Sequence, residues 1–249
     1  MEGWTSLGAA ARDLVLGETC AGCQAPTGGG PVCSGCWAGL AVDPRRVRPL
    51  DPPLDFPPTF AARDYEGVVR RLLVVHKEQG RLSLARPLGV LLQAAVVAGR
   101  AGRRGPEVLV PVPSRRSVTR RRGHDPVTRM ARVAAPALGT SVSVRPVLGH
   151  RRRVIDQSGL DLEQRRANLG GALAVIASPA QLGGHDVVLV DDICSSGSTL
   201  AAASRALRSV GVPAERIRAA VVATPVLRRA WPAATSRGHP LLPGRPPRD

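Results

Sequence analysis

The chain has 249 residues, a formal net charge of +16 and an aromatic content of only 2%. This length is enough for one α/β domain with a small appendage, and the core must be built from Val, Leu and Ala. The longest apolar run, 88–98, is shorter than the roughly 20 residues of a membrane span. The N-terminus also lacks the layout of a secretory signal. We therefore expect a cytoplasmic protein without a membrane span.

Arginine dominates the positive charge, because Lys77 is the one lysine in the chain. The excess is concentrated between Arg103 and Arg153. Arginine-rich surfaces bind phosphate groups, either of pyrophosphate or of a nucleic-acid backbone. The alternative is a biased composition with solvated charges. The scarcity of aromatic residues argues against a platform on which single-stranded bases stack.

Two Cys-x-x-Cys pairs follow a short amphipathic helix predicted over Trp4–Leu16. Nine residues separate the pairs, a spacing typical of a four-cysteine zinc site in which the metal replaces a hydrophobic core. Two disulfides or free thiols are the alternatives, and a cytosolic location disfavours disulfides. The predicted zinc ligands are Cys20, Cys23, Cys33 and Cys36.

A Pro- and Arg-rich stretch, 43–58, predicts a linker between this module and the main domain. A strand or turn is then expected before a helix over Val68–Val75, and a second helix over Ser83–Ala98. Lys77 lies at the end of the first helix. It is interpreted as a phosphate contact or, equally, as a solvated lysine near the negative end of the helix dipole.

Residues 107–113 form an apolar strand that ends in two prolines and turns into a basic stretch. Ligands bind at the carboxyl ends of strands in open α/β sheets, so this stretch predicts anion contacts, with Arg115 and Arg122 as the candidates for pyrophosphate. Asp125 and Pro126 predict the start of a helix over 127–138, interrupted by Pro136. Further strands are expected over 142–148, 172–176 and 217–223.

The most informative stretch is Val187–Leu200. Four apolar β-formers predict a buried strand, two carboxylates follow, and a small hydroxyl-rich loop precedes a helix. Loop N–H groups and the helix N-terminus can hold a phosphate, and Gly197 permits a positive φ. An ordinary strand–turn–helix with a capping Asp or Ser is the alternative. Cys194, within this stretch, is interpreted as loop filler and not as a nucleophile.

This stretch resembles the 5-phosphoribosyl-1-pyrophosphate (PRPP) signature of type I phosphoribosyltransferases. The resemblance implies that the acidic pair contacts the ribose hydroxyls, or a magnesium ion bound to them, and that the loop holds the 5′-phosphate. In this sequence the implied acidic pair is Asp191 and Asp192, and the implied loop is Ser195, Ser196, Gly197, Ser198 and Thr199.

From Cys20 to about Thr224 the chain resembles the competence protein F (ComF) family. The resemblance rests on the order of the motifs, and it departs from the family at His124-Asp125 and Ser195-Ser196. The matching residues are the two Cys-x-x-Cys pairs, Tyr65, Gly67, Lys77, Val110–Pro113, Arg122, Gln157, Leu160, Arg165, Asn168 and the PRPP loop.

The resemblance implies an α/β type I phosphoribosyltransferase fold, a mostly parallel sheet with helices on both faces, preceded by a small four-cysteine zinc module. The expected division is 1–45 for the N-terminal helix and zinc module, 46–58 for the linker, 59–225 for the phosphoribosyltransferase-like domain and 226–249 for a disordered tail. It also implies PRPP and Mg²⁺ binding and a role in natural transformation, handling single-stranded DNA beside a helicase partner.

Three functions stay open from the sequence. The first is an enzyme that transfers phosphoribose from PRPP to an acceptor. The second is a non-catalytic module that binds PRPP or a nucleotide and holds DNA and a protein partner. The third is a nucleobase phosphoribosyltransferase of nucleotide salvage, which would need a base-recognising hood.

Overall fold

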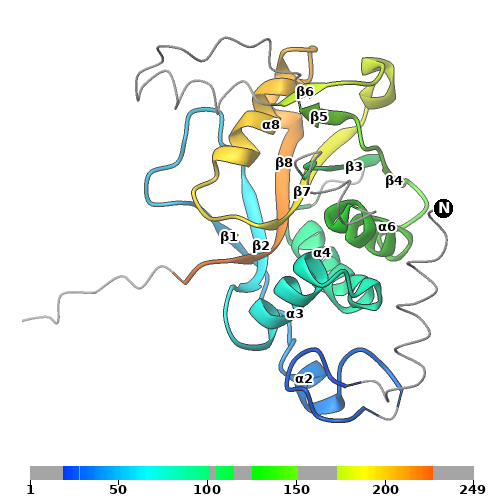
Figure 1. The fold of residues 1–249 in the computed structure, drawn as a ribbon. Coiled ribbons are helices and arrows are strands. Elements are labelled where there is room, and N and C mark those ends of the chain that lie inside the picture. Colours follow the sequence, from blue (N-terminus) through cyan, green and yellow to red (C-terminus); the bar gives the residue numbers. More distant parts are fainter. Residues whose placement is uncertain are drawn as a thin grey trace, which may run out of the picture.

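A largely parallel β-sheet forms the centre of the computed structural model, which describes residues 19–27, 29–100, 102, 105–114, 125–150 and 173–226. Six strands lie in the order β1-β2-β8-β7-β3-β4 (Figure 1), and within this sheet β1 is antiparallel to β2 while the remaining neighbours are parallel. The strands are β1 (Arg45–Val47), β2 (Thr59–Asp64), β3 (Glu107–Pro111), β4 (Val142–Val144), β7 (Asp186–Ile193) and β8 (Ile217–Thr224). The predicted mostly parallel α/β sheet is confirmed.

Helices cover both faces of this sheet, as Figure 1 shows. Helices α3 (Gly67–Glu78), α4 (Ala85–Ala98) and α6 (Pro126–Leu138) pack on one face, and α8 (Ser198–Arg208) packs on the other. The short elements are α2 (Ser34–Ala38) and the 3₁₀ turns η1 (Leu82–Leu84), η2 (Pro179–Leu182) and η3 (Ala214–Arg216). None of the helices in the described ranges combines the length and hydrophobicity needed to cross a bilayer.

The alternation of side chains along the strands produces two separate cores. On β7, Val188 and Val190 pack against α3, α4 and α6, whereas Val187 and Leu189 pack on the α8 side. All four side chains are fully buried. A strand covered on both faces needs such a continuous apolar run, so the interpretation of 187–190 as a doubly buried strand is confirmed.

Helix α6 begins as predicted and ends differently. The carboxylate of Asp125 accepts the backbone N–H of Thr128 at 2.8 Å, and Pro126 occupies the first helical position. The predicted interruption at Pro136 is wrong, because the helix continues to Leu138. Pro136 lies on the exposed side in the last turn, where water can satisfy the carbonyl that loses its partner.

The single strand predicted over 142–148 is wrong as well. Residues 142–144 form β4 beside β3, while β5 (Leu148–His150) pairs antiparallel with β6 (Leu173–Val175) in a separate two-stranded sheet. Pro146 lies between them and has no N–H to donate to a ladder, so pairing with β3 ends there.

The Pro-rich segment 46–58 lies along the sheet and α8. Its first residues continue β1, which pairs with β2. Asp55, whose φ is 66°, forms ion pairs with Arg205 and Arg208 of α8. The segment that the sequence assigns to a linker therefore also contributes an edge strand and contacts to the domain.

A cluster of charged residues lies at the amino ends of the parallel strands, with Glu107 and Arg218 buried at its centre. We call it the amino-end cluster; it consists of Arg100, Glu107, Asp186, Arg216 and Arg218. Arg218 forms an ion pair with Glu107 and lies 3.5 Å from Asp186, and Arg100 donates to Glu107 at 2.8 Å. These pairs tie β3, β7 and β8 together at the end opposite the predicted phosphate loop.

Candidate phosphoribosyl site and cysteine cluster

The acidic pair lies at the carboxyl end of β7, where its two side chains emerge on opposite faces of the sheet. Asp191 and Asp192 directly precede Ile193, the last residue of β7, so they belong to the strand itself. Because side chains alternate, Asp192 shares a face with Val188 and Val190, and Asp191 shares a face with Val187 and Leu189. Asp192 is buried and Asp191 is partly buried.

Lys77 reaches this pair from the last turn of α3. Its Nζ lies 2.7 Å from Oδ2 of Asp192. The sequence named Lys77 as a phosphate contact or as a solvated lysine, and the structure shows an ion pair with the acidic pair. The partners are 115 residues apart, so no local pattern could have indicated the contact.

Burial raises the pKa of Asp191 well above its ordinary value, and the neighbouring charge of Asp192 raises it further. The Asp191 carboxylate also accepts the backbone N–H of Asp192 at 2.8 Å, which works in the opposite direction. The two adjacent carboxyl groups therefore occupy different environments, with the Lys77 ammonium in direct contact with Asp192.

The predicted phosphate loop joins β7 to the N-terminus of α8. Gly197 has φ 76° and caps the helix, so the expected positive φ is confirmed. Ser198 and Thr199 form the first turn of α8, and the Ser196 hydroxyl donates to that of Ser198 at 3.1 Å. Ser195, Ser196, Ser198 and Thr199 are exposed. The loop thus presents hydroxyl groups and helix N-terminal N–H groups to one place, an arrangement that can bind an anion.

An aromatic ring lies against this loop. A Cβ added to Gly197 would lie 2.6 Å from ring atoms of Phe56 and 3.1 Å from Pro49, so the ring packs directly on the glycine. Phe56 also lines a cavity of about 480 Å³, and the polar residues that line it include Arg46 and Arg48. Sequence analysis missed this wall because Phe56 lies in the stretch interpreted as a linker.

Cys194 is buried and fixes the strand end. Its backbone N–H donates to Ala223 at 3.0 Å, and its carbonyl accepts the Thr224 hydroxyl at 3.0 Å. Burial raises the pKa of the Cys194 thiol to about 11. A thiol protonated at neutral pH and shielded from solvent is not a nucleophile, in agreement with its interpretation as filler.

The basic stretch after β3, with Arg115 and Arg122, falls outside the described residues. So does the range 151–172, which contains Gln157, Leu160, Arg165 and Asn168. Ser114 and Asp125, which flank the undescribed residues 115–124, are in contact: the backbone N–H of Ser114 donates to the Asp125 carboxylate at 3.2 Å. The same carboxylate caps α6. The strand end and the helix start are thereby held at the carboxyl edge of the sheet, next to β7.

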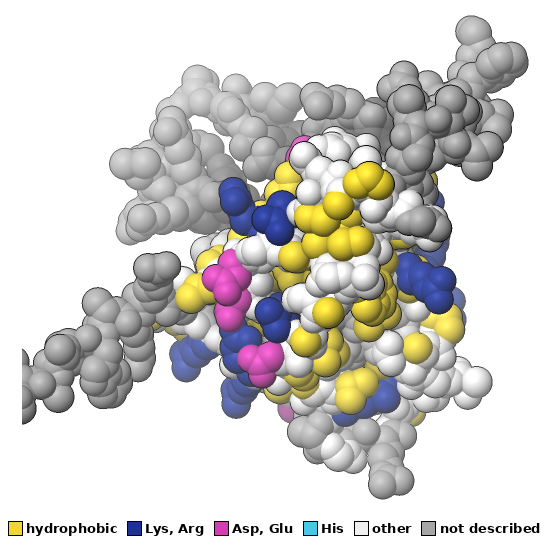
Figure 2. Space-filling view, turned by 90° about the horizontal axis from the view of Figure 1, so that it is seen from below, with side chains coloured by type: hydrophobic (Ala, Val, Ile, Leu, Met, Phe, Trp, Pro, Cys, Tyr) yellow, Lys and Arg dark blue, Asp and Glu magenta, His cyan; other side chains and the backbone are white. Residues whose placement is uncertain are grey.

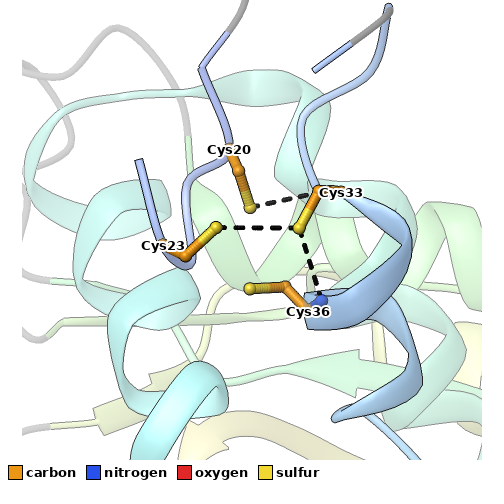
Figure 3. Close-up of side chains that lie close together, drawn as sticks. All are labelled: Cys20, Cys23, Cys33 and Cys36. Carbon is orange, nitrogen blue, oxygen red and sulfur yellow. Dashed lines mark hydrogen bonds between the residues drawn. The ribbon is translucent and has the colours of Figure 1, made fainter. Parts of the chain in front are cut away.

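The four predicted cysteine ligands converge, as Figure 3 shows. All four sulfur atoms lie within 4.8 Å of one another, and Cys23 and Cys33 are 3.6 Å apart. Four sulfurs bound to one Zn²⁺ at about 2.3 Å are about 3.8 Å from each other, so the spacing suits a tetrahedral ion. The cluster can therefore hold a metal ion.

Backbone geometry prepares one of these thiols for metal binding. Burial raises the pKa of Cys20, but N–H groups of Cys33, Cys23 and Gly22 donate to its sulfur and lower it to about 6. Burial raises the pKa of Cys36 to about 12, assisted by the neighbouring sulfurs. Thiolates are the zinc-binding form, and a metal ion would have to displace the Cys36 proton.

The cysteine cluster rests on α3, the helix that carries Lys77. Ala21 and Leu40 belong to the core under α3 and α4, and Gly22 and Gly39 lie close to Val68. The Arg81 guanidinium donates to the carbonyl of Thr19 at 2.7 Å. These contacts attach the cysteine cluster to the main domain.

Residues 139–233 match the family model described as the phosphoribosyl transferase domain. Over 196 residues the chain is 26% identical to Competence protein F of Haemophilus influenzae, an alignment that covers 78% of this chain and 85% of that protein. The matched domain contains the acidic pair and the loop after it. These similarities and the four clustered cysteines agree with the resemblance drawn from the sequence.

Proposed function

Because the chain is a ComF-like protein with a phosphoribosyltransferase domain, we propose that it binds PRPP at the carboxyl end of β7. The observation that carries this proposal is the junction of β7 and α8. Two carboxylates with different environments lie beside a glycine-capped helix N-terminus with exposed hydroxyl groups. A sugar phosphate needs both features: carboxylates that accept hydrogen bonds from the ribose hydroxyls, and N–H groups that donate to the phosphate.

In this proposal the 5′-phosphate binds to Ser195, Ser196, Gly197, Ser198 and Thr199. Asp191 and Asp192 accept hydrogen bonds from the ribose hydroxyls. Phosphoribosyl transfer would break the bond between C1 and the pyrophosphate oxygen, and an acceptor nucleophile would form the new bond at C1. The domain's contribution would be positioning and charge stabilisation. Arg115 and Arg122 stay candidates for pyrophosphate contacts.

Mg²⁺ suits this site because oxygen ligands are the ones it prefers, and Asp191 and Asp192 supply them. Bound with PRPP, the ion would neutralise charge on the pyrophosphate. Zn²⁺ is the proposed occupant of Cys20, Cys23, Cys33 and Cys36, with a structural role. Metal analysis of freshly purified, reduced protein should find about one zinc per chain. Zinc-free protein that folds normally would contradict this assignment.

The proposed biological role is in DNA uptake during natural transformation, with single-stranded DNA and a helicase as partners. The name of the similar Haemophilus influenzae protein and the net charge of +16 support it. On the face drawn in Figure 2, however, Lys and Arg side chains are dispersed among apolar and acidic ones. The second candidate is a nucleobase phosphoribosyltransferase of salvage, for which the cavity beside Phe56 is the specific observation.

PRPP binding is tested by calorimetry with the Asp191→Asn, Asp192→Asn double variant. We expect PRPP affinity to fall about 100-fold, because two hydrogen bonds to carboxylates are weakened. The matched control is Asp186→Asn, which alters a carboxylate at the other end of the same strand. Equal affinities of the wild type and the double variant would refute the site.

Turnover is tested separately by pyrophosphate release from PRPP across a panel of nucleobases. Release with one base identifies a salvage enzyme. Binding without release supports a sensor or adaptor, and affinity for single-stranded DNA that falls with salt would then support the DNA-handling role.

A further inference from the structure

The contact between Lys77 and Asp192 joins the last turn of α3 to the carboxyl end of β7. Nζ of Lys77 lies 2.7 Å from Oδ2 of Asp192, a distance typical of a strong charge-assisted hydrogen bond. The Asp192 side chain is 9% exposed and the Lys77 side chain is 38% exposed. The ammonium group is therefore in contact with a buried carboxylate, while part of the lysine side chain is exposed.

Each carboxylate of the acidic pair has one oxygen that accepts a hydrogen bond from the protein. Oδ2 of Asp192 accepts from Lys77, and Oδ1 of Asp191 accepts from the backbone N–H of Asp192. The side chains of Asp191 and Asp192 also interact with each other. The Asp192 carboxylate is thus held in orientation at the end of β7 by Lys77.

The charge of Lys77 also matters for the acidic pair. Asp192 lies buried beside a second carboxyl group, where an unpaired negative charge is costly. The Lys77 ammonium, 2.7 Å from Oδ2, is the cation in direct contact with the Asp192 carboxylate. Lys77 is the one lysine in an arginine-rich chain, and its ammonium group is a compact charge that contacts one carboxylate oxygen.

We propose that Lys77 is a positioning residue of the phosphoribosyl site, which orients Asp192 to accept a ribose hydroxyl. The proposal rests on the proposed PRPP site. It differs from the interpretation of Lys77 as a direct phosphate contact, because the lysine acts through the ribose and not through the pyrophosphate or the 5′-phosphate.

Three ligands separate these possibilities: inorganic phosphate, ribose 5-phosphate and PRPP. For Lys77→Met we expect the affinity for ribose 5-phosphate and for PRPP to fall by the same factor, about 10-fold, which one charge-assisted hydrogen bond gives. Phosphate affinity should change less than about twofold. Lys77→Arg should restore at least part of the loss. Arg71→Met is the matched control, because it removes an exposed positive charge from the same helix.

A double-mutant cycle completes the test. In the Asp192→Asn background, Lys77→Met should cause no further loss of ribose 5-phosphate affinity. Independent losses in the cycle overturn the proposal. A loss confined to PRPP also overturns it and assigns Lys77 to the pyrophosphate. An equal loss for all three ligands, with a lower melting temperature, leaves Lys77 as a structural residue only.

If Lys77→Met fails to fold, Lys77→Gln provides the neutral variant with a polar end group. The outcome for the proposed function is separate from these results. Wild-type protein that binds neither ribose 5-phosphate nor PRPP refutes the phosphoribosyl site itself, whereas normal wild-type binding with unchanged Lys77 variants refutes only the positioning role.

Discussion

The two ends of the parallel sheet use the same kinds of charged residue in opposite ways. At the amino end, Arg218 and Glu107 have side chains only 6% and 4% exposed, and further arginines and Asp186 surround them. At the carboxyl end, Asp192 forms an ion pair with the partly exposed Lys77, and the acidic pair adjoins an exposed loop. The amino-end cluster pairs two carboxylates with three arginines, while the carboxyl end has two carboxylates beside one lysine and exposed donors.

Burial and pairing of the charges distinguish a structural charge cluster from a candidate binding site within one sheet. Buried charges that satisfy each other contribute to the fold and have little left to offer a ligand. Charged groups beside solvent, exposed hydroxyl groups and a helix N-terminus are available to a ligand. Substitutions at the two ends should therefore separate stability from binding.

The largest effect on stability is expected for Glu107→Ala. It removes the main anion of the buried Arg218 and should lower the free energy of unfolding by about 3–5 kcal/mol in urea denaturation. Phosphate affinity of the folded protein should not change. Arg216→Ala, at the exposed rim of the same cluster, should cost less than about 1 kcal/mol. Similar losses in both variants would show that burial does not distinguish the pairs.

Gly197→Ala is expected to have an intermediate effect. Its φ of 76° and the ring of Phe56 at 2.6 Å from the new Cβ should cost about 1–3 kcal/mol of stability. The same change should weaken phosphate binding, since it displaces the loop. Gly35→Ala is the matched control, because a Cβ there meets nothing within 4 Å. Unchanged phosphate affinity in the Gly197 variant would place the anion elsewhere.

The smallest effect concerns the pH dependence of Asp191. Its pKa is raised in the folded state, so the unfolded state releases the proton more readily as pH rises above the ordinary value of 3.8. Ionisation of Asp191 therefore costs stability at neutral pH. Asp191→Asn should raise the melting temperature at pH 7 by about 2–4 °C, the shift for about 1 kcal/mol in a domain of this size.

The gain from Asp191→Asn should shrink as the pH falls and disappear about one unit below 3.8, where the wild-type carboxyl group is protonated in both states. Thermal scans from about pH 3 to about pH 8 measure this directly. A constant gain at all pH values would contradict a raised pKa. Asp192→Asn should behave oppositely and lower stability, because it breaks the ion pair with Lys77.

Local patterns predicted the elements that position the site. The run of apolar residues predicted β7, and the small residues after it predicted the positive φ at Gly197. The paired Cys-x-x-Cys spacing predicted which four sulfurs converge. Each of these features depends on residues close together in the chain, whose conformational preferences act without the rest of the fold.

Contacts between distant segments could not be predicted in this way. The ion pair of Lys77 with Asp192 and the packing of Phe56 on Gly197 both arise when the chain folds. Sequence analysis placed Phe56 in a linker because prolines usually indicate exposed, extended chain. It also joined β4 and β5 across Pro146, where the loss of one N–H separates two sheets.

The double contact of Asp125 has a consequence for how this protein can change. One side chain fixes the start of α6 and, through the N–H of Ser114, the end of the segment that follows β3. Because a single carboxylate makes both contacts, loss of Asp125 would release two segments at once, the start of α6 and the chain that leaves β3. The integrity of this edge of the sheet thus depends on one side chain to an unusual degree.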